Sequence, residues 1–133
     1  MKISKRLSLI FCLIFLFGCA YNPATVLDNH FQDLDLENRF EQYYSELKRG
    51  MRPYNTDIAI DILIDDISKI NMEDQRANDI FALITAALNK LKEGAVSYLN
   101  GDYELYEQQI EEAYEMYKQA LSERRSFMVD NNV

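Results

Sequence analysis

Apolar residues recur three or four positions apart along most of the chain from residue 25 onward, which is the spacing of one face of an α-helix. The pattern divides into four regions: residues 25–49, 55–70, 71–99 and 103–127. Residues that interrupt helices are few after residue 20 and fall mostly between these regions: Pro23, Gly50, Pro53, Gly94 and Gly101. The sequence therefore predicts an all-α fold, a small antiparallel helical bundle of about four helices.

The first region carries two apolar faces that are out of line with each other. One face is formed by Leu27, Phe31 and Leu34. The other, offset by two residues, is formed by Leu36, Phe40, Tyr43 and Leu47. The offset predicts a kink or break near Asp35, which would cap the second part. We expect Gly50 to end this region and residues 51–54 to form a loop.

Residues 55–70 fit two kinds of secondary structure. Isoleucines alternate with other residues at positions 58, 60, 62 and 64, as they would in a β-strand. A helical face fits equally well and is formed by Ile60, Leu63, Ile64, Ile67 and Ile70. The length of the region and its helical neighbours favour a helix, because a lone strand would have no partner. In a helix, Ile58 and Ile62 fall on the polar side.

The third and fourth regions are expected to form an antiparallel hairpin. Asn71 is predicted to cap the third helix, with Glu73 and Asp74 in its first turn, where negative charge suits the helix dipole. Gly101 supplies a left-handed stop, and Asp102 caps the fourth helix. The third helix has a wide apolar face, which predicts a central position: Ile80, Ile84, Ala87, Leu88, Leu91, Ala95 and Tyr98.

Four tyrosines lie on the apolar side of the fourth predicted helix: Tyr103, Tyr106, Tyr114 and Tyr117. Tyrosine lines the margins of protein cores, with its hydroxyl reaching water, and it is also frequent at protein interfaces. The core interpretation is favoured, because this helix needs large side chains to bury against the third helix. A binding surface is the alternative that the pattern leaves open.

The first nineteen residues follow a different pattern. A basic head precedes an apolar run of roughly ten residues, shorter than the roughly 20 needed to cross a bilayer. This arrangement is typical of a secretory signal peptide. Its end, Leu16-Phe17-Gly18-Cys19, resembles the lipobox of bacterial lipoproteins. The resemblance implies cleavage before Cys19 and attachment of a diacylglyceryl group to the cysteine sulfur, often with acylation of the freed amine.

The implied processing divides the chain into a signal peptide at residues 1–18, a lipidated Cys19 with a short tether at residues 19–24, and a helical bundle domain at residues 25–129. Removing residues 1–18 takes away three positive charges and shifts the net charge from −8 to −11. Because so acidic a body is repelled by phosphates, we expect no nucleic-acid partner and membrane attachment through the lipid anchor.

The resemblance also gives an expected location, in the cell envelope and facing outside the cytoplasm. Lipoproteins retained in the inner membrane of Gram-negative bacteria resemble one another in an aspartate after the lipidated cysteine. This chain has Ala20 there. In a Gram-negative host, the outer membrane is therefore the expected location.

The residue inventory supplies little for catalysis. The chain has one histidine, His30, and lacks the motifs of serine nucleophiles, phosphate-binding loops and zinc-binding histidine pairs. Both cysteines, Cys12 and Cys19, precede residue 20, so the body has no thiol for a disulfide or a metal site. A calcium-loop pattern beginning at Asn100 has Leu105 where the loop needs glycine. We expect no enzyme and no cofactor besides the covalent lipid. The alternative is a small-ligand or cation-binding lipoprotein.

The most distinctive predicted surface lies on residues 55–70. It combines aspartates repeated every four residues with the two isoleucines of the polar side: Asp57, Asp61, Asp65, Asp66, Ile58 and Ile62. Exposed isoleucines ringed by carboxylates suit a protein partner with apolar residues and Lys or Arg, and a solubilising face is the other interpretation. The function expected from the sequence is that of a membrane-anchored envelope lipoprotein that binds another protein, as an adaptor, assembly factor or inhibitor.

Overall fold

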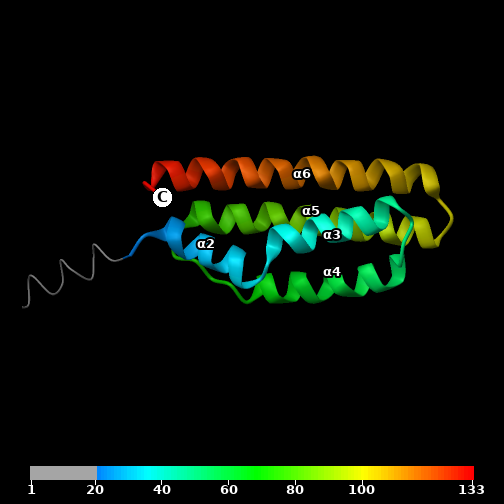
Figure 1. Ribbon diagram of the computed structural model, residues 1–133, viewed down its shortest axis with the longest axis horizontal. Coiled ribbons are helices and arrows are strands. Elements are labelled where there is room, and N and C mark those ends of the chain that lie inside the picture. The colour runs from blue at the N-terminus through cyan, green and yellow to red at the C-terminus, as the bar shows by residue number, and fades with distance from the viewer. Residues whose placement is uncertain (1–20) are drawn as a thin grey trace, which may run out of the picture.

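The computed structural model describes residues 21–133. The predicted signal peptide, the predicted lipid site Cys19 and the start of the tether lie outside the described residues. The described chain forms five α-helices: α2 Pro23–Asp33, α3 Leu36–Lys48, α4 Pro53–Ser68, α5 Gln75–Leu99 and α6 Tyr103–Asp130 (Figure 1). No β-strand occurs within residues 21–133, which confirms the predicted all-α fold for this part of the chain.

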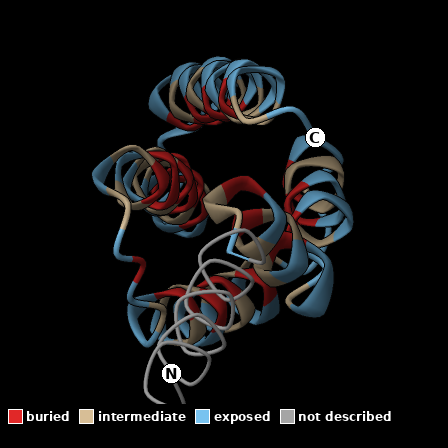
Figure 2. Ribbon diagram, turned by 90° about the vertical axis from the view of Figure 1, so that its left-hand side faces the viewer, coloured by how far each residue is buried: buried red, intermediate tan, exposed pale blue. Residues whose placement is uncertain are grey.

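The five helices occupy four positions around one core (Figure 2). α2 and α3 follow one another along one edge, and α5 and α6 form a long hairpin. Of the described helices, α4 packs only against α3 and α5, and α6 lies diagonally opposite it. The architecture is therefore the predicted antiparallel bundle. It has five described helices rather than about four, because the first helical region is split in two.

The split between α2 and α3 lies where the two apolar faces of the sequence are out of line. Asp35 has a left-handed backbone conformation with a φ of 52°, which turns the chain between the helices. Its side chain accepts a hydrogen bond from the Asn38 side-chain amide at 2.7 Å and caps no backbone N–H. The predicted break is confirmed. Asp35 occupies the predicted N-cap position of α3, but its side chain makes no capping hydrogen bond and is bound to the Asn38 amide instead.

Arg124 of α6 joins the two short helices from across the bundle. Its guanidinium donates hydrogen bonds to Asp28 of α2 and to Glu37 of α3. It also lies over the ring of Phe31, 4.5 Å from the ring centroid. The Arg124 side chain is only 15% exposed, so solvent screens these contacts less than those of a surface ion pair. This Arg124 clamp fixes α2 and α3 relative to each other across the break.

Three helix boundaries extend beyond the predicted ones. α2 begins at Pro23, so the last two residues of the predicted tether are helical. α4 begins at Pro53, because proline suits the first helical position, where its missing N–H would have no helical partner. Residues 53 and 54 are therefore helical, and the predicted loop at 51–54 is too long. α6 ends at Asp130, one residue past the predicted end of the domain.

The start of α5 corrects the predicted cap. Asp74, not Asn71, caps this helix, and its carboxylate accepts the Ala77 backbone N–H at 3.0 Å. Met72 explains the later start, because its side chain is buried in the core. The Asn78 side chain fixes the Met72 backbone, accepting its N–H at 3.1 Å and donating to its C=O at 2.7 Å. Anchored in this way, residues 71–74 stay outside the helix.

The core is one cluster of buried apolar residues from all five helices. In Figure 2 the buried parts of the ribbons face the middle of the bundle. Its large and completely covered members include Leu27, Leu36, Phe40, Leu47, Ile60, Leu63, Ile80, Ile84, Leu88, Leu91 and Phe127. α5 contributes more buried residues than any other described helix, as its wide apolar face predicts. Aromatic packing joins α3 to α6, where Phe40 stacks on Tyr117 with ring centroids 4.0 Å apart.

Two left-handed glycines close the connections at the end of the bundle remote from Pro23, which we call the distal end (Figure 1). Gly101, with a φ of 80°, follows α5, and Asp102 accepts the Leu105 N–H at 3.2 Å, so both predictions for this turn are confirmed. Gly50, with a φ of 65°, follows α3. A Cβ at residue 50 would lie 2.7 Å from the Tyr98 hydroxyl oxygen, so the loop rests directly on α5.

Candidate functional site

The candidate site begins with the two faces of α4. Its inner face is buried against α3 and α5 and is formed by Thr56, Ile60, Leu63 and Ile67. Its outer face carries a line of large apolar side chains in water: Tyr54 is 64% exposed, Ile58 44% and Ile62 54%. We call these three residues the outer ridge. The prediction that this region is a helix rather than a strand is confirmed, although the helix ends at Ser68 instead of residue 70. The alternating isoleucines result from a helix that carries apolar residues on both sides.

All four predicted aspartates lie on α4 beside the outer ridge, but the chain supplies cations to most of them. Lys92 of α5 binds Asp61 with its Nζ 2.5 Å from the carboxylate, and this hydrogen bond raises the pKa of Lys92. Lys69 lies 3.0 Å from Asp65 and 4.0 Å from Asp66. The aspartates therefore present less net charge than their number implies. The sequence pattern gave no sign of Lys92, because its pairing depends on how α4 and α5 align.

Asp57 differs from the other three aspartates. It is half-buried, and its Oδ1 atom is covered without a hydrogen-bond partner. Nearby Thr56 is buried and satisfied, because its hydroxyl donates to a Glu46 carboxylate oxygen at 3.0 Å. The α3–α4 contact is thus polar at the distal end and apolar further along.

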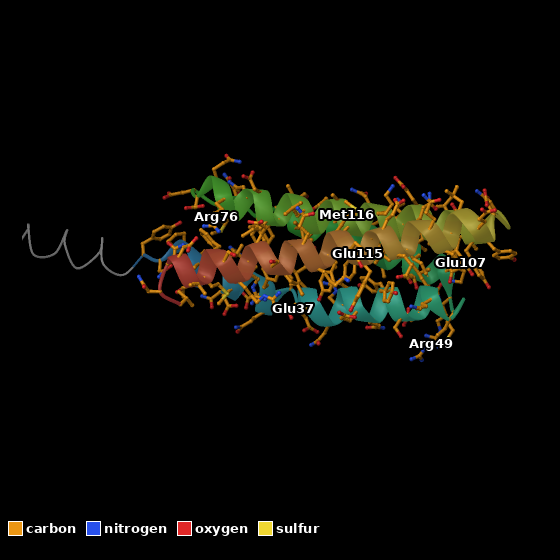
Figure 3. All side chains as sticks on the ribbon, turned by 90° about the horizontal axis from the view of Figure 1, so that it is seen from above. Glu37, Arg49, Arg76, Glu107, Glu115 and Met116 are labelled. Atoms are coloured by element: carbon orange, nitrogen blue, oxygen red, sulfur yellow. The ribbon has the colours of Figure 1, made fainter. Side chains whose placement is uncertain are left out.

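Two arginines lie at the ends of the loop that joins α3 to α4, and sequence reasoning missed them: Arg49 is the C-cap of α3 and Arg52 the N-cap of α4. Arg49 and Arg52 are exposed, and neither has a carboxylate within 4.0 Å among the described residues. Figure 3 shows Arg49 at the end of the bundle remote from the grey N-terminal residues. Arg52 has a left-handed backbone with a φ of 48° directly before Pro53. This geometry begins α4 immediately after the loop.

The four tyrosines of α6 have three different environments. Tyr106 and Tyr117 are buried, so the core interpretation is confirmed for these two. Tyr114 is half-buried and stacks on Tyr44 of α3 with ring centroids 4.4 Å apart. Tyr103 is exposed at the distal end. The tyrosines therefore do not form one open groove.

A polar cluster beside Tyr44 connects α3 to α6. The Tyr44 hydroxyl donates to Glu111 at 2.8 Å, and Lys48 donates to the same hydroxyl at 3.0 Å and to Glu111 at 3.2 Å. The hydrogen bond from Tyr44 lowers the pKa of the Glu111 carboxyl. Because the three side chains form hydrogen bonds with one another, the cluster serves as a structural contact between α3 and α6.

An open groove of about 400 Å³ lies between α5 and α6. Its floor is apolar, with Ile80, Ala82 and Leu83, and its rim is charged, with Arg76, Asp79 and Glu123. In Figure 3 Arg76 lies at the N-terminal part of α5. Arg76 is already bound to Asp130, 2.6 Å away. This groove is the place that the ligand-binding alternative would use.

The residues considered for catalysis and metal binding remain apart. His30 is half-buried and lies edge-on to Phe81, with ring centroids 6.2 Å apart. Within residues 21–133, no three His, Cys, Asp or Glu side chains gather in a way that would hold a metal ion. None of the described helices combines the length and the apolar character needed to cross a membrane.

Comparisons with known proteins assign no family to this chain. No family model matches the chain, and neither curated proteins nor solved structures gave a match.

Proposed function

We propose that this protein is a membrane-anchored envelope lipoprotein that binds another protein through the outer face of α4, as an adaptor, assembly factor or inhibitor. The observation that carries the proposal is the outer ridge. Tyr54, Ile58 and Ile62 stand in water on a helix whose opposite face is already buried. Aligned apolar side chains of this kind lose solvent-exposed area when a partner covers them, which favours binding.

The surroundings of the outer ridge support a partner with basic and apolar residues. Four aspartates flank the ridge: Asp57 has no lysine partner among the described residues, and Asp61, Asp65 and Asp66 remain partly exposed beside Lys92 and Lys69. Carboxylates beside an apolar strip select a partner by charge and speed its approach at low salt. Because α4 has no described neighbour on its outer side, a partner can approach it without rearranging the bundle.

The anchor is the second part of the proposal. The lipobox resemblance at Leu16-Phe17-Gly18-Cys19 supports a covalent lipid on Cys19 and a location facing outside the cytoplasm. Ala20, in place of an aspartate, supports the outer membrane if the host is Gram-negative. A change of Cys19→Ser should abolish labelling with a radioactive fatty acid and release the protein from membranes or leave it unprocessed. Normal processing and continued partition into detergent would overturn the lipoprotein assignment.

The binding face is tested by affinity capture of the lipidated protein from its own host. The double change Ile58→Ser and Ile62→Ser should leave the thermal melt nearly unchanged, because both side chains are exposed, and should weaken capture of the partner. Val129→Ser is the matched control, because Val129 is exposed at the opposite end of the bundle. A large loss of stability would place the isoleucines in the monomer's core. Unchanged capture would remove the outer ridge from the binding face.

The alternative, a small-ligand or cation binder, rests on the groove between α5 and α6. Leu83→Gln in its floor separates the two functions, because Leu83 lies on the other side of α5 from the outer ridge. The measurement is whether each variant restores the phenotype of a host strain that lacks the protein. If Leu83→Gln fails to restore it and the isoleucine variant succeeds, the groove is the functional site.

A further inference from the structure

We propose that the outer face of α4 binds the same face of a second copy of this chain, with the two α4 helices antiparallel across a twofold axis near Ile58. The inference rests on the proposed function in one respect, that the outer face of α4 is a binding face. It adds the identity of an occupant. In this arrangement Tyr54 of one copy faces Ile62 of the second copy, and Ile58 faces Ile58.

The shape of the outer ridge fits a helix. Its three side chains follow one another at a spacing of four residues and span about 12 Å of helix axis. Rows of side chains at this spacing are the ridges that pack into the grooves of a neighbouring helix. A convex face with one such row is matched by another helix, as the inner face of α4 is matched by α3 and α5.

The charges along α4 identify that helix as α4 of a second copy. Arg49 and Arg52 precede the ridge and have no ion-pair partner among the described residues, so that end carries a charge of +2. Asp65 and Asp66 follow the ridge and share Lys69, so that end keeps a net charge of only −1. An antiparallel pair places the arginines of each copy beside the aspartates of the other. A parallel pair would oppose like charges. The helix dipoles also favour the antiparallel arrangement.

Net charge makes this face the natural one for self-association. The chain after residue 18 carries a net charge of −11, so most of its surface repels a second copy. The segment 49–69 holds three cations and four carboxylates, a net charge of only −1. Repulsion between copies is therefore small where the two α4 segments meet. A twofold pair covers the outer ridge of both copies, so association stops at the dimer.

The size of the interface predicts weak association. One helix pair covers less than the ~800 Å² per partner of a standard interface. Confinement of anchored chains to one membrane would raise their effective concentration and favour the pair. The antiparallel arrangement puts the two Pro23 ends at opposite ends of the dimer. The pair covers Ile58 and Ile62, so any other partner of this face competes with the second copy.

Cysteine trapping tests the pairing directly. The body from residue 20 to 133 contains the whole described core and no cysteine, so each introduced thiol is the only one present. Ile58→Cys should form a disulfide-linked dimer under mild oxidation, because residue 58 lies next to the axis. Ile62→Cys alone should not, whereas a mixture of Ile62→Cys and Tyr54→Cys chains should cross-link. Val129→Cys measures random collision.

The outcomes of trapping separate the possible arrangements. If Ile58→Cys cross-links no faster than Val129→Cys, the proposal is overturned. If Ile62→Cys links to itself as readily as Ile58→Cys, the pair is parallel and the proposed arrangement is wrong. A melt of each reduced variant like that of the parent confirms that the trapped chains are folded.

Charge reversal tests the polarity independently. Reversing Arg49 and Arg52 to Glu should weaken self-association about tenfold in sedimentation experiments at high protein concentration, and so should reversing Asp65 and Asp66 to Lys. All four changes in one chain should restore association, because both ends of the interface then exchange sign. Failure of the combined variant to recover would refute the antiparallel pairing.

A monomeric body whose partner capture still needs Ile58 and Ile62 would overturn this inference and leave the proposed function standing. A dimer that captures no other protein would do the reverse.

Discussion

The position of Leu91 allows a quantitative test of the core. Leu91 of α5 is completely buried, whereas Leu99, on the same helix, is 49% exposed. The change of either leucine to alanine removes the same atoms from the same helix. Intrinsic helix propensity therefore nearly cancels between the two variants, since alanine and leucine are both strong helix formers. The difference between them isolates the effect of burial.

The expected magnitude follows from the loss of buried area and the cavity that remains. Leu→Ala at a fully buried site costs about 2–5 kcal/mol, and a value near the middle is expected for Leu91, which lies in the part of α5 enclosed by other helices. For a domain of about 110 residues, 1 kcal/mol corresponds to roughly 4 °C in melting temperature, so Leu91→Ala should lower it by about 12–16 °C. Leu99→Ala should cost less than about 1 kcal/mol.

Chemical denaturation followed by far-UV circular dichroism measures both variants against the parent. The two unfolding curves should keep the same dependence on denaturant and differ in midpoint. A cost for Leu91→Ala below about 1 kcal/mol, or equal costs for the two variants, would show that α5 does not bury the face described above.

Three further outcomes are expected. Gly50→Ala should destabilise the fold by more than Gly101→Ala in denaturant titrations, because both lose about 1–2 kcal/mol to a left-handed backbone but only the Cβ at residue 50 meets a tyrosine hydroxyl at 2.7 Å; equal costs would contradict that close contact. Arg124→Ala should lower the free energy of unfolding by about 2 kcal/mol, because it removes the contacts to Asp28 and Glu37. Arg125→Ala, at an exposed position, should change it by less than about 0.5 kcal/mol, and similar values for the two variants would show that the Arg124 clamp does not stabilise the fold. Burial raises the pKa of Tyr117, so the unfolded chain loses this proton first and stability should fall as the pH rises above about 10. Tyr117→Phe should reduce that alkaline loss in melts at stepped pH, and an unchanged loss would assign it to other groups.

The parts of the fold that depend on nearby residues were predictable from the sequence. Helical spacing and sparse glycines located all the helical regions, and the offset between Leu34 and Leu36 located the break between α2 and α3. Gly101 and Asp102 have the predicted roles, because a left-handed stop and a cap depend on only a few neighbouring positions. Each of these features depends on residues close together in the chain.

The features that were missed depend on contacts between distant residues. The start of α5 is set by Met72 in the core and by its two hydrogen bonds to Asn78. Without these contacts, the sequence pattern predicted the cap at Asn71. The Arg124 clamp joins α6 to α2 and α3, so its partners depend on the alignment of helices about ninety residues apart. Helical spacing identifies which face of a helix is apolar, but not which side chain on another helix it meets.

The candidate surface was found in the sequence because two periodicities conflicted there. A single buried face on residues 55–70 would need no isoleucine at 58 or 62, so their presence indicated a second apolar face before its surroundings were known. The structure adds the direction of that face: Tyr54 extends the ridge toward Arg49 and Arg52, and Lys92 and Lys69 reduce the acidity of its flank. An acidic strip alone would favour any basic partner. A ridge with a net positive charge before it and a net negative charge after it favours a partner of matching polarity, and α4 of a second copy has that polarity. The more acidic faces of two copies repel each other. Of the faces described above, α4 is therefore the one through which two copies can associate.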